Sequence, residues 1–306
     1  MSIALIIPDR DLTQLEQRLQ ASLTDTKVEI WPNISQKDQV EFALVWKPPL
    51  GSLSSLTNLK AIQCFGAGVD AILLDPALPD VPIARIVDDK LNQTMVNYLQ
   101  GVVAHYKLRL DQFSQQQQQG IWKPKSPRKL ASICILGLGE LGSAAAKHFV
   151  DLGYQVSGWS RTAKKLADVT CYSGEAELSQ AVANADVVIC LLPLTDKTEN
   201  LLNAAVFAQF KTNSIFINVA RGAIVDDKAL IDALDSGKLQ AACLDVFRQE
   251  PLANTDPFWQ HPAILITPHI SAVTNLNSAI EQTLLNYQRY KQGLPMLNVI
   301  DRKQGY

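Results

Sequence analysis

The feature that most constrains this chain is a glycine-rich turn, GLGELG, between an apolar run and an alanine-rich stretch. Gly137, Gly139 and Gly142 have the spacing G-x-G-x-x-G, which by itself is weak evidence. Here the turn follows the strand-like segment 132–136 and opens the helical segment 141–152, as a dinucleotide-binding turn requires. The first glycine permits the tight turn, the second lets the backbone approach a pyrophosphate, and the third allows close helix packing. The turn therefore predicts a Rossmann-type dinucleotide-binding domain whose helix N-terminus binds phosphates.

Short apolar runs alternate with helical stretches along the chain, which is typical of α/β domains with parallel sheets. The runs expected as strands are 3–7, 28–31, 42–46, 59–65 and 83–87, followed by 132–136, 155–159, 187–191, 214–219, 241–246 and 264–266. The stretch 93–113 has the period of one long helix, and the glutamine run after it reads as the solvated end of that helix. At 306 residues the chain has the length of about two domains.

Because strand–helix units precede the glycine turn and a helical segment ends the chain, we expect one domain to be inserted in the other. We expect an α/β fold of two doubly wound parallel-sheet domains. Residues 96–275 would form the NAD(P)-binding Rossmann domain, and residues 1–95 with 276–306 a flavodoxin-like substrate domain.

Charge and cysteine content exclude several classes of protein. The chain has 28 Lys+Arg against 30 Asp+Glu, so its net charge of −2 argues against a nucleic-acid binder that relies on electrostatic attraction. No apolar run is long enough for a membrane span, and the N-terminus reads as a first strand rather than a signal peptide. The five cysteines are scattered, with no CxxC and no Cys/His cluster, so we expect no metal site and a cytoplasmic location.

The end of the second Rossmann strand indicates which dinucleotide binds. An NAD-preferring site usually has an acidic residue there, which accepts a hydrogen bond from the ribose 2′-OH. In this chain the place is taken by Ser160 and Arg161, with Lys164 and Lys165 shortly after. A hydroxyl and a guanidinium suit a 2′-phosphate, which a carboxylate would repel. The sequence thus favours NADP(H), with NAD(H) as the other possibility.

Three later strands each end in polar residues. Arg221 follows one strand, Asp245 and Glu250 follow the next, and His269 follows the third. Since ligands of an open α/β sheet bind outside the carboxyl ends of the strands, these groups are expected to meet beside the nicotinamide. Arginine can bind a substrate carboxylate, and histidine can donate the proton that a nascent alkoxide needs. A carboxylate beside that histidine stabilises the imidazolium and fixes its tautomer. The set suits the reduction of a 2-oxo acid.

Together these motifs carry a family resemblance over the whole chain. GLGELG, LLPLTDKTENLLN, INVARG, LDVFRQEPL and TPHIS resemble the D-isomer-specific 2-hydroxyacid dehydrogenase family. ALVWKPP, CFGAGVD, GWSRT, ALDSGK, WQHPAILITPH and IDRKQGY resemble its glyoxylate/hydroxypyruvate reductase A branch in particular. Two stretches depart from the pattern: Lys47 stands where that branch is expected to have a histidine, and DDKLNQTMVNY lacks the common Asn-Ala-Ser-Val-Ala-Glu motif.

The resemblance implies a role for each matching residue. Arg221, Glu250 and His269 would be catalytic, with His269 as the general acid and Glu250 as its partner. The residues implied to bind the cofactor are Gly137, Gly139, Glu140, Leu141 and Gly142 at the pyrophosphate, Ser160 and Arg161 at the 2′-phosphate, Leu192, Pro193 and Thr198 on the adenosine side, and Asp245 at the nicotinamide carboxamide. The backbone amides of Ala67 and Gly68 would bind the substrate carboxylate, and Trp46 would line the substrate pocket.

The resemblance implies an NADPH-dependent oxidoreductase that converts glyoxylate to glycolate and hydroxypyruvate to D-glycerate, assembled as a homodimer. One alternative is a family member that reduces a bulkier 2-oxo acid. Another is a dinucleotide-sensing, corepressor-like binding protein on the same fold. The complete set of Arg221, Glu250 and His269 argues against the sensor, because a sensor needs no proton donor.

Overall fold

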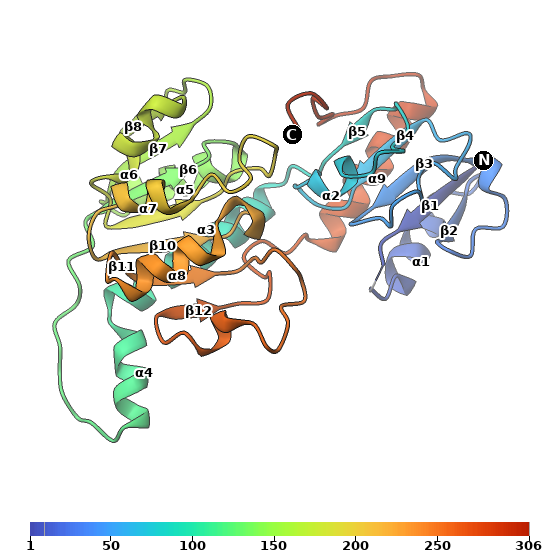
Figure 1. Cartoon of the computed structure of the whole chain (residues 1–306). Helices are drawn as coiled ribbons and strands as arrows, with labels where there is room; N and C mark the ends of the chain where they lie inside the picture. The colour runs from blue at the N-terminus through green and yellow to red at the C-terminus, as the bar shows by residue number, and fades with distance from the viewer. Residues whose placement is uncertain (9, 306) are drawn as a thin grey trace. The chain divides into compact units, whose positions relative to one another are not determined.

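The computed structural model describes residues 1–8 and 10–305, and the chain divides into two compact units (Figure 1). Unit 1 comprises residues 1–89 and 274–306, and unit 2 comprises residues 90–273. The boundary expected after residue 95 falls inside helix α3 (Asp89–Lys107), nearly all of which belongs to unit 2. Unit 2 is thus inserted between the two segments of unit 1.

Unit 1 is a five-stranded parallel sheet in the order β2-β1-β3-β4-β5. Its elements are β1 (Ser2–Ile6), α1 (Thr13–Ser22), β2 (Lys27–Ile30), β3 (Val40–Val45), β4 (Ala61–Cys64), α2 (Asp70–Leu73), β5 (Ile83–Ala84) and α9 (Leu276–Lys291). Successive β1 side chains enter opposite cores: Ile3 and Leu5 pack with α1 and α9, whereas Ala4 and Ile6 pack on the other face. Burial on both faces explains why these strands read as continuous apolar runs. The strand order is the flavodoxin-like one expected from the sequence.

Unit 2 is a seven-stranded parallel sheet in the order β12-β11-β10-β9-β6-β7-β8. Its strands are β6 (Ser132–Leu136), β7 (Gln155–Ser160), β8 (Val169–Ser173), β9 (Val187–Cys190), β10 (Ser214–Asn218), β11 (Leu239–Leu244) and β12 (Ile264–Ile266). This is the Rossmann order with one further strand, and the order reverses between β6 and β9. The sequence prediction of six strands was wrong in omitting β8. That strand lies at the edge of the sheet, and its residues are at least partly exposed, so it has no apolar run.

Helices cover both faces of the unit 2 sheet, as the two apolar cores show. Helix α3 and α5 (Glu140–Asp151) pack on one face. On the other lie α6 (Leu178–Val182), α7 (Ala204–Gln209) and α8 (Asp227–Asp235). Burial raises the pKa of the Cys134, Cys190 and Cys243 thiols to about 12. These thiols behave as small apolar groups of the core.

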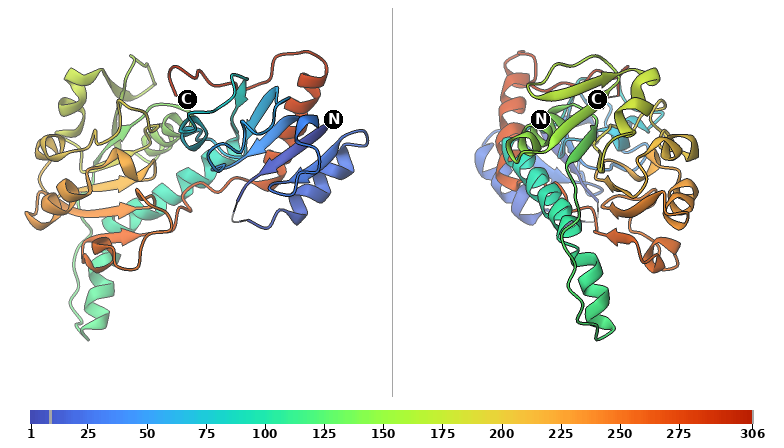
Figure 2. Two further views of the ribbon diagram at one scale, coloured as in Figure 1. Left: turned by 45° about the vertical axis from the view of Figure 1, so that its right-hand side comes forward. Right: turned by 90° about the vertical axis from the view of Figure 1, so that its left-hand side faces the viewer.

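An arm extends from the body of unit 2 and consists of α4 (Leu110–Gln118) and the segment 119–130 that runs back beside it (Figures 1 and 2). The prediction of one helix over 93–113 was wrong. The chain breaks at Arg109, which has a left-handed backbone with φ of 62° and donates from Nε to the carbonyl oxygen of Ser126 at 2.6 Å. The glutamine run does lie in the last turns of α4, as the sequence predicted.

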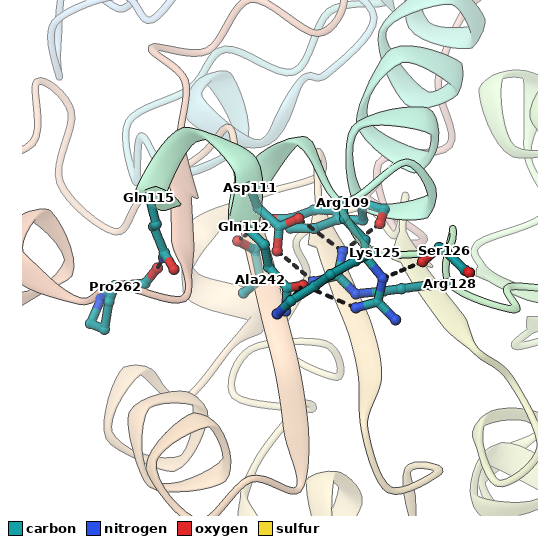
Figure 3. A network of polar contacts seen from close by, with 10 residues as sticks. Arg109, Asp111, Gln112, Gln115, Lys125, Ser126, Arg128, Ala242 and Pro262 are labelled. Carbon is teal, nitrogen blue, oxygen red and sulfur yellow. Dashed lines mark hydrogen bonds and ion pairs between the residues drawn. The ribbon is translucent and has the colours of Figure 1, made fainter. Parts of the chain in front are cut away.

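A partly buried ion pair between Arg128 and Asp111 joins the two segments of the arm where it meets the rest of unit 2 (Figure 3). The Arg128 guanidinium donates to both carboxylate oxygens of Asp111, at 2.8 and 2.6 Å, and also to the carbonyl oxygen of Tyr106. Farther along α4, Gln115 donates to the carbonyl oxygen of Pro262 at 3.3 Å. Since a bidentate arginine–carboxylate pair is geometrically specific, these contacts set the direction in which the arm leaves the body.

Candidate active site

The glycine turn lies at the topological switch point of the unit 2 sheet, directly after β6. Gly137 has φ of 105°, and a Cβ there would lie 2.7 Å from the carbonyl oxygen of Leu191 at the end of β9. A Cβ on Gly142 would lie 1.8 Å from the carbonyl oxygen of Gly137, whereas one on Gly139 would meet nothing within 4 Å. Gly139 is the N-cap of α5, so its open side adjoins the helix end where backbone N–H groups are unpaired within the helix. The turn therefore fits a pyrophosphate on geometry, with Glu140 and Leu141 in the first helical turn.

Ser160 and Arg161 lie together at the carboxyl end of β7, next to the glycine turn. Ser160 is nearly buried, and its hydroxyl donates to the carbonyl oxygen of Thr162 at 2.9 Å. Arg161 is exposed, and no acidic side chain occupies the last position of the strand. The strand end is therefore polar and cationic, as the sequence predicted.

The segment after β9 forms the other side of the switch point. The Leu192 side chain is buried in the core with the strand residues of β9. The Thr198 hydroxyl donates to the carbonyl oxygen of Pro193 at 2.7 Å. This bond closes the loop over residues 193–198, which keeps Pro193 and Thr198 near the strand end.

Arg221 follows β10 and is held by its neighbours in an extended backbone conformation. The buried Asn218 side chain donates to the carbonyl oxygen of Arg221 at 3.1 Å and accepts the N–H of Ala220 at 3.1 Å. Directly after it, a Cβ on Gly222 would lie 2.0 Å from the carbonyl carbon of Phe247. The glycine thus lets the arginine turn touch the loop that leads to Glu250. Neither Asn218 nor Gly222 was singled out from the sequence, although both belong to the INVARG motif.

His269 and Glu250 form a hydrogen-bonded pair after β12 and β11. The imidazole Nδ1 lies 2.8 Å from Oε2 of Glu250, while Oε1 accepts the N–H of Phe247 at 3.1 Å. His269 has a left-handed backbone with φ of 55°, and about 29% of its side chain is exposed. The pair leaves Nε2 of the imidazole as the ring nitrogen not bound to Glu250. The arrangement is that of a histidine whose tautomer and orientation are set by a carboxylate.

Asp245 is fully buried, and its backbone and side chain bind the segment that carries His269. Its carbonyl oxygen accepts the N–H of His269 at 2.9 Å. Its two carboxylate oxygens accept the N–H groups of Ile270 and Ser271, each at 2.8 Å. The resemblance implied that Asp245 lies at the nicotinamide carboxamide; what the structure shows is that its carboxylate binds the segment after His269.

The three residues expected at the substrate lie at the carboxyl end of the unit 1 sheet. Trp46 follows β3, and Ala67 and Gly68 follow β4. A Cβ on Gly66 would lie 2.2 Å from the Trp46 ring, so the absence of a side chain lets the indole lie against the β4 loop. The Arg10 guanidinium also lies near this ring, 6.0 Å from its centroid. In this parallel sheet the end of β3 borders the switch point between β1 and β3.

Comparison with known proteins places this fold and site in one family. The sequence pattern of the NAD binding domain of D-isomer specific 2-hydroxyacid dehydrogenases matches residues 101–271. The chain belongs to the D-isomer specific 2-hydroxyacid dehydrogenase family. A glyoxylate/hydroxypyruvate reductase A of Yersinia enterocolitica is 36% identical to this dehydrogenase, over all of both chains.

Two solved structures resemble this dehydrogenase over its full length. A D-isomer specific 2-hydroxyacid dehydrogenase of Xanthobacter autotrophicus, solved with NADPH, has a TM-score of 0.93 and 36% identity, and covers 100% of this chain and 99% of its own. An NADPH-dependent glyoxylate/hydroxypyruvate reductase of Sinorhizobium meliloti, solved with NADP, has a TM-score of 0.92 and 30% identity at the same coverage. The dehydrogenase fold and the NAD-binding domain predicted from the sequence are confirmed.

Two of the other histidines form hydrogen bonds with side chains outside the candidate active site. His148, in the last turn of α5, pairs with Gln100 at 2.9 Å, and His261 pairs with Asp235 at 3.3 Å. Within the described ranges, 1–8 and 10–305, no cluster of His, Cys, Asp or Glu could hold a metal ion. In the same ranges no helix is both long and apolar enough to cross a membrane.

Proposed function

We propose that this dehydrogenase reduces small 2-oxo acids of the glyoxylate and hydroxypyruvate type with NADPH. The observation that carries the proposal is the 2.8 Å pair of His269 and Glu250. These residues follow β12 and β11, which belong to the same parallel sheet as β6, the strand that leads into the glycine turn. The relatives named above as glyoxylate/hydroxypyruvate reductases support the substrate class. D-glycerate and glycolate are then the products.

The dinucleotide fits the turn on the contacts described for its three glycines. A side chain on Gly142 would collide with the turn, and the open face of Gly139 leaves room for a pyrophosphate beside the N-terminus of α5. Bound there, NADPH supplies the hydride. The residues of this chain that would hold it are the glycine turn with Glu140 and Leu141, Ser160, Arg161, Leu192, Pro193, Thr198 and Asp245.

The chain's own groups account for the rest of the reaction. Arg221 binds the carboxylate of the 2-oxo acid and polarises its carbonyl, because a guanidinium presents two parallel donors. His269 donates a proton from Nε2 to the oxygen on which negative charge develops. Glu250 accepts from Nδ1, and this holds the ring in the protonated form that a donor requires. The amides of Ala67 and Gly68 and the ring of Trp46 are the groups we expect at the substrate in unit 1.

We also propose that NADPH is preferred over NADH and that the protein is a cytoplasmic homodimer. Arg161 supports the first, since it lies at the strand end where a 2′-phosphate would be bound. The arm supports the dimer, because Trp122, on the segment after α4, is 99% exposed and Ile121 beside it is 47% exposed. Exposed apolar residues on a protruding segment commonly mark a protein–protein interface.

One steady-state experiment tests the proposed function. Initial rates are measured with NADPH and with NADH against glyoxylate, hydroxypyruvate, pyruvate and phenylpyruvate. We expect the highest kcat/KM for one of the first two acids with NADPH. A preference for phenylpyruvate would favour the bulkier-substrate alternative. Tight NADPH binding without turnover of any acid would favour the sensor.

A further inference from the structure

The segment that carries His269 is bound through three successive backbone N–H groups to one residue. Asp245 accepts the N–H of His269 with its carbonyl oxygen, and those of Ile270 and Ser271 with its two carboxylate oxygens. His269 has a left-handed backbone with φ of 55°, a conformation that is unfavourable for a residue other than glycine. The direction of the imidazole therefore depends on where the Asp245 carboxylate lies.

A chain of hydroxyl groups in turn fixes that carboxylate. Thr267 Oγ1 donates to Oδ1 of Asp245 at 2.6 Å, and the Tyr98 hydroxyl lies 2.6 Å from the same Thr267 oxygen. Cys243 Sγ lies 3.3 Å from the Tyr98 hydroxyl. Tyr98 comes from α3, on the face of the sheet that α3 and α5 cover, whereas Thr267 directly follows β12.

The hydrogen bonds of this series can all be donated in the direction of Asp245. A carboxylate can only accept, so the single proton of the Thr267 hydroxyl goes to Asp245. The Thr267 oxygen can then accept from Tyr98, whose hydroxyl stays protonated because burial raises its pKa far above the usual value. Burial keeps the Cys243 thiol protonated as well, so it is able to donate to the Tyr98 oxygen, which lies 3.3 Å from Sγ. Hydrogen bonds aligned in one direction polarise and strengthen one another.

We propose that Tyr98 is a positioning residue for His269 and acts through Thr267 and Asp245. It does not touch the reacting atoms. It holds the Thr267 hydroxyl in the rotamer that binds Asp245, and Asp245 holds the three amides of the segment 269–271. The inference rests on the proposed function in that His269 is taken as the proton donor. It also gives a task to the stretch DDKLNQTMVNY, which departs from the family motif.

The test compares Tyr98→Phe with Tyr106→Phe. Tyr106 is a matched control, because it lies two turns later on α3, is buried, and donates to the carbonyl oxygen of Ala242 at 2.8 Å. Both changes remove one buried hydroxyl that bonds to the same sheet, but Tyr106 has no bond to the segment 267–271. We expect Tyr98→Phe to lower kcat about 3- to 10-fold with KM for the acid and NADPH affinity unchanged, as the loss of one hydrogen bond implies. Tyr106→Phe should keep the kcat of the parent.

A second readout does not depend on turnover. Hydrogen exchange of the cofactor-free protein, followed by mass spectrometry, reports the amides of residues 269–271 in a peptide of that region. We expect about a 3- to 10-fold faster exchange there in Tyr98→Phe and no change there in Tyr106→Phe. Equal exchange in both variants and the parent would overturn the proposal. If the parent protein reduces no 2-oxo acid, the proposed function fails, while the exchange experiment still decides whether Tyr98 orders this segment.

Thr267 provides the rescue experiment. Thr267→Ser keeps the hydroxyl and should retain most of the parent kcat and exchange protection. Thr267→Val has nearly the same shape without a donor to Asp245, so it should behave like Tyr98→Phe or worse. The double variant Tyr98→Phe/Thr267→Val should be no slower than Thr267→Val alone, since both residues act in series. If the losses of kcat in the two single variants added fully in the double variant, this would contradict a single series of hydrogen bonds through Thr267.

Discussion

A side chain on Gly142 would enter the space of the Gly137 carbonyl group, because its Cβ would lie 1.8 Å from that oxygen. The first turn of α5 thus packs directly on the backbone of the glycine turn. This contact joins the end of β6 to the helix whose N-terminus faces the pyrophosphate site. The two glycines are therefore needed for the turn to fold, before any ligand binds.

Gly142→Ala should lower the free energy of unfolding. We expect a loss of about 3 kcal/mol or more, since the clash is with backbone that cannot rotate away. The midpoint of thermal unfolding should fall by about 6–12 °C, measured by circular dichroism or calorimetry.

Gly139→Ala is the matched control, because its Cβ would meet nothing within 4 Å and its extended backbone suits alanine. It should keep the parent stability and lose dinucleotide affinity, as measured by fluorescence titration with NADPH. Unchanged NADPH affinity in Gly139→Ala would show that the pyrophosphate does not approach this glycine.

The glycine turn could be predicted from the sequence because strand, turn and helix are adjacent in the chain. The pairing of His269 with Glu250 could be anticipated for a related reason: parallel strands bring their carboxyl ends to one edge. By contrast, strand β8 gave no signal, since an edge strand need not be apolar on both faces. The segment 169–173 has no continuous apolar run, because Thr170 and Ser173 interrupt it.

The contacts around Tyr98 and Arg109 could not be predicted, because they depend on tertiary structure. Tyr98 and Thr267 are 169 residues apart, so no local motif contains both of them. The break at Arg109 involves no glycine or proline, and it is accompanied by a bond to Ser126 on the returning segment. Local propensity favours one continuous helix there, and long-range contacts override it.

Arg161→Ala should separate the two dinucleotides. A charge-assisted hydrogen bond to the 2′-phosphate is worth about 1.5–3 kcal/mol, so NADPH affinity should fall roughly 10- to 150-fold. NADH lacks that phosphate, and its affinity should change little. Isothermal titration with each dinucleotide measures both, and Lys165→Ala, an exposed cation on the same loop, serves as the control. Equal losses for NADPH and NADH would refute the assignment of Arg161.

Asp186→Asn should destabilise unit 2 at neutral pH but not in acid. Burial by itself would raise the pKa of the Asp186 carboxyl, but the Lys211 ammonium and the amides of Ala131 and Ser132 outweigh it and hold the pKa below its usual range. A lowered folded pKa contributes stability above the unfolded value of about 3.9, and this stability disappears as the pH falls through the folded pKa.

We therefore expect Asp186→Asn to lose about 1–3 kcal/mol at pH 7, with the difference from the parent shrinking below about pH 4. Urea unfolding at several pH values measures it. Asp232→Asn is the control, since its pair with Lys228 is exposed on α8 and contributes little. A constant difference across the pH range would show that the effect is not electrostatic.

Trp122→Lys should disrupt the proposed dimer. Trp122 is 99% exposed on the segment after α4, and a charge there opposes burial against a second copy. Light scattering at micromolar concentration should give the mass of a dimer for the parent and of a monomer for the variant. Leu152→Lys, at a site 48% exposed after α5, should leave the mass unchanged. A monomeric parent protein would rule out the homodimer itself.

His269→Ala should slow reduction about 10²- to 10⁴-fold in kcat, the usual contribution of a positioned general acid. Hydride transfer places negative charge on the substrate oxygen, and without His269 that charge must be neutralised by water. Glu250→Gln should lower kcat less, because the imidazole keeps its place but loses the charge that stabilises its protonated form. Stopped-flow or steady-state oxidation of NADPH measures the rates, and fluorescence titration should give unchanged NADPH affinity for both variants.

His261→Ala is the control for this prediction, because His261 is also paired with a carboxylate, that of Asp235 at 3.3 Å, but precedes β12, whereas His269 follows the carboxyl end of that strand. It should retain the parent kcat. Arg221→Ala should differ from His269→Ala by raising KM for the acid as well as lowering kcat, since it removes both the carboxylate contact and the polarisation of the carbonyl. A His269→Ala enzyme with the parent kcat would mean that the proton comes from another group, and neither the role of Glu250 nor that of Tyr98 would then survive in its present form.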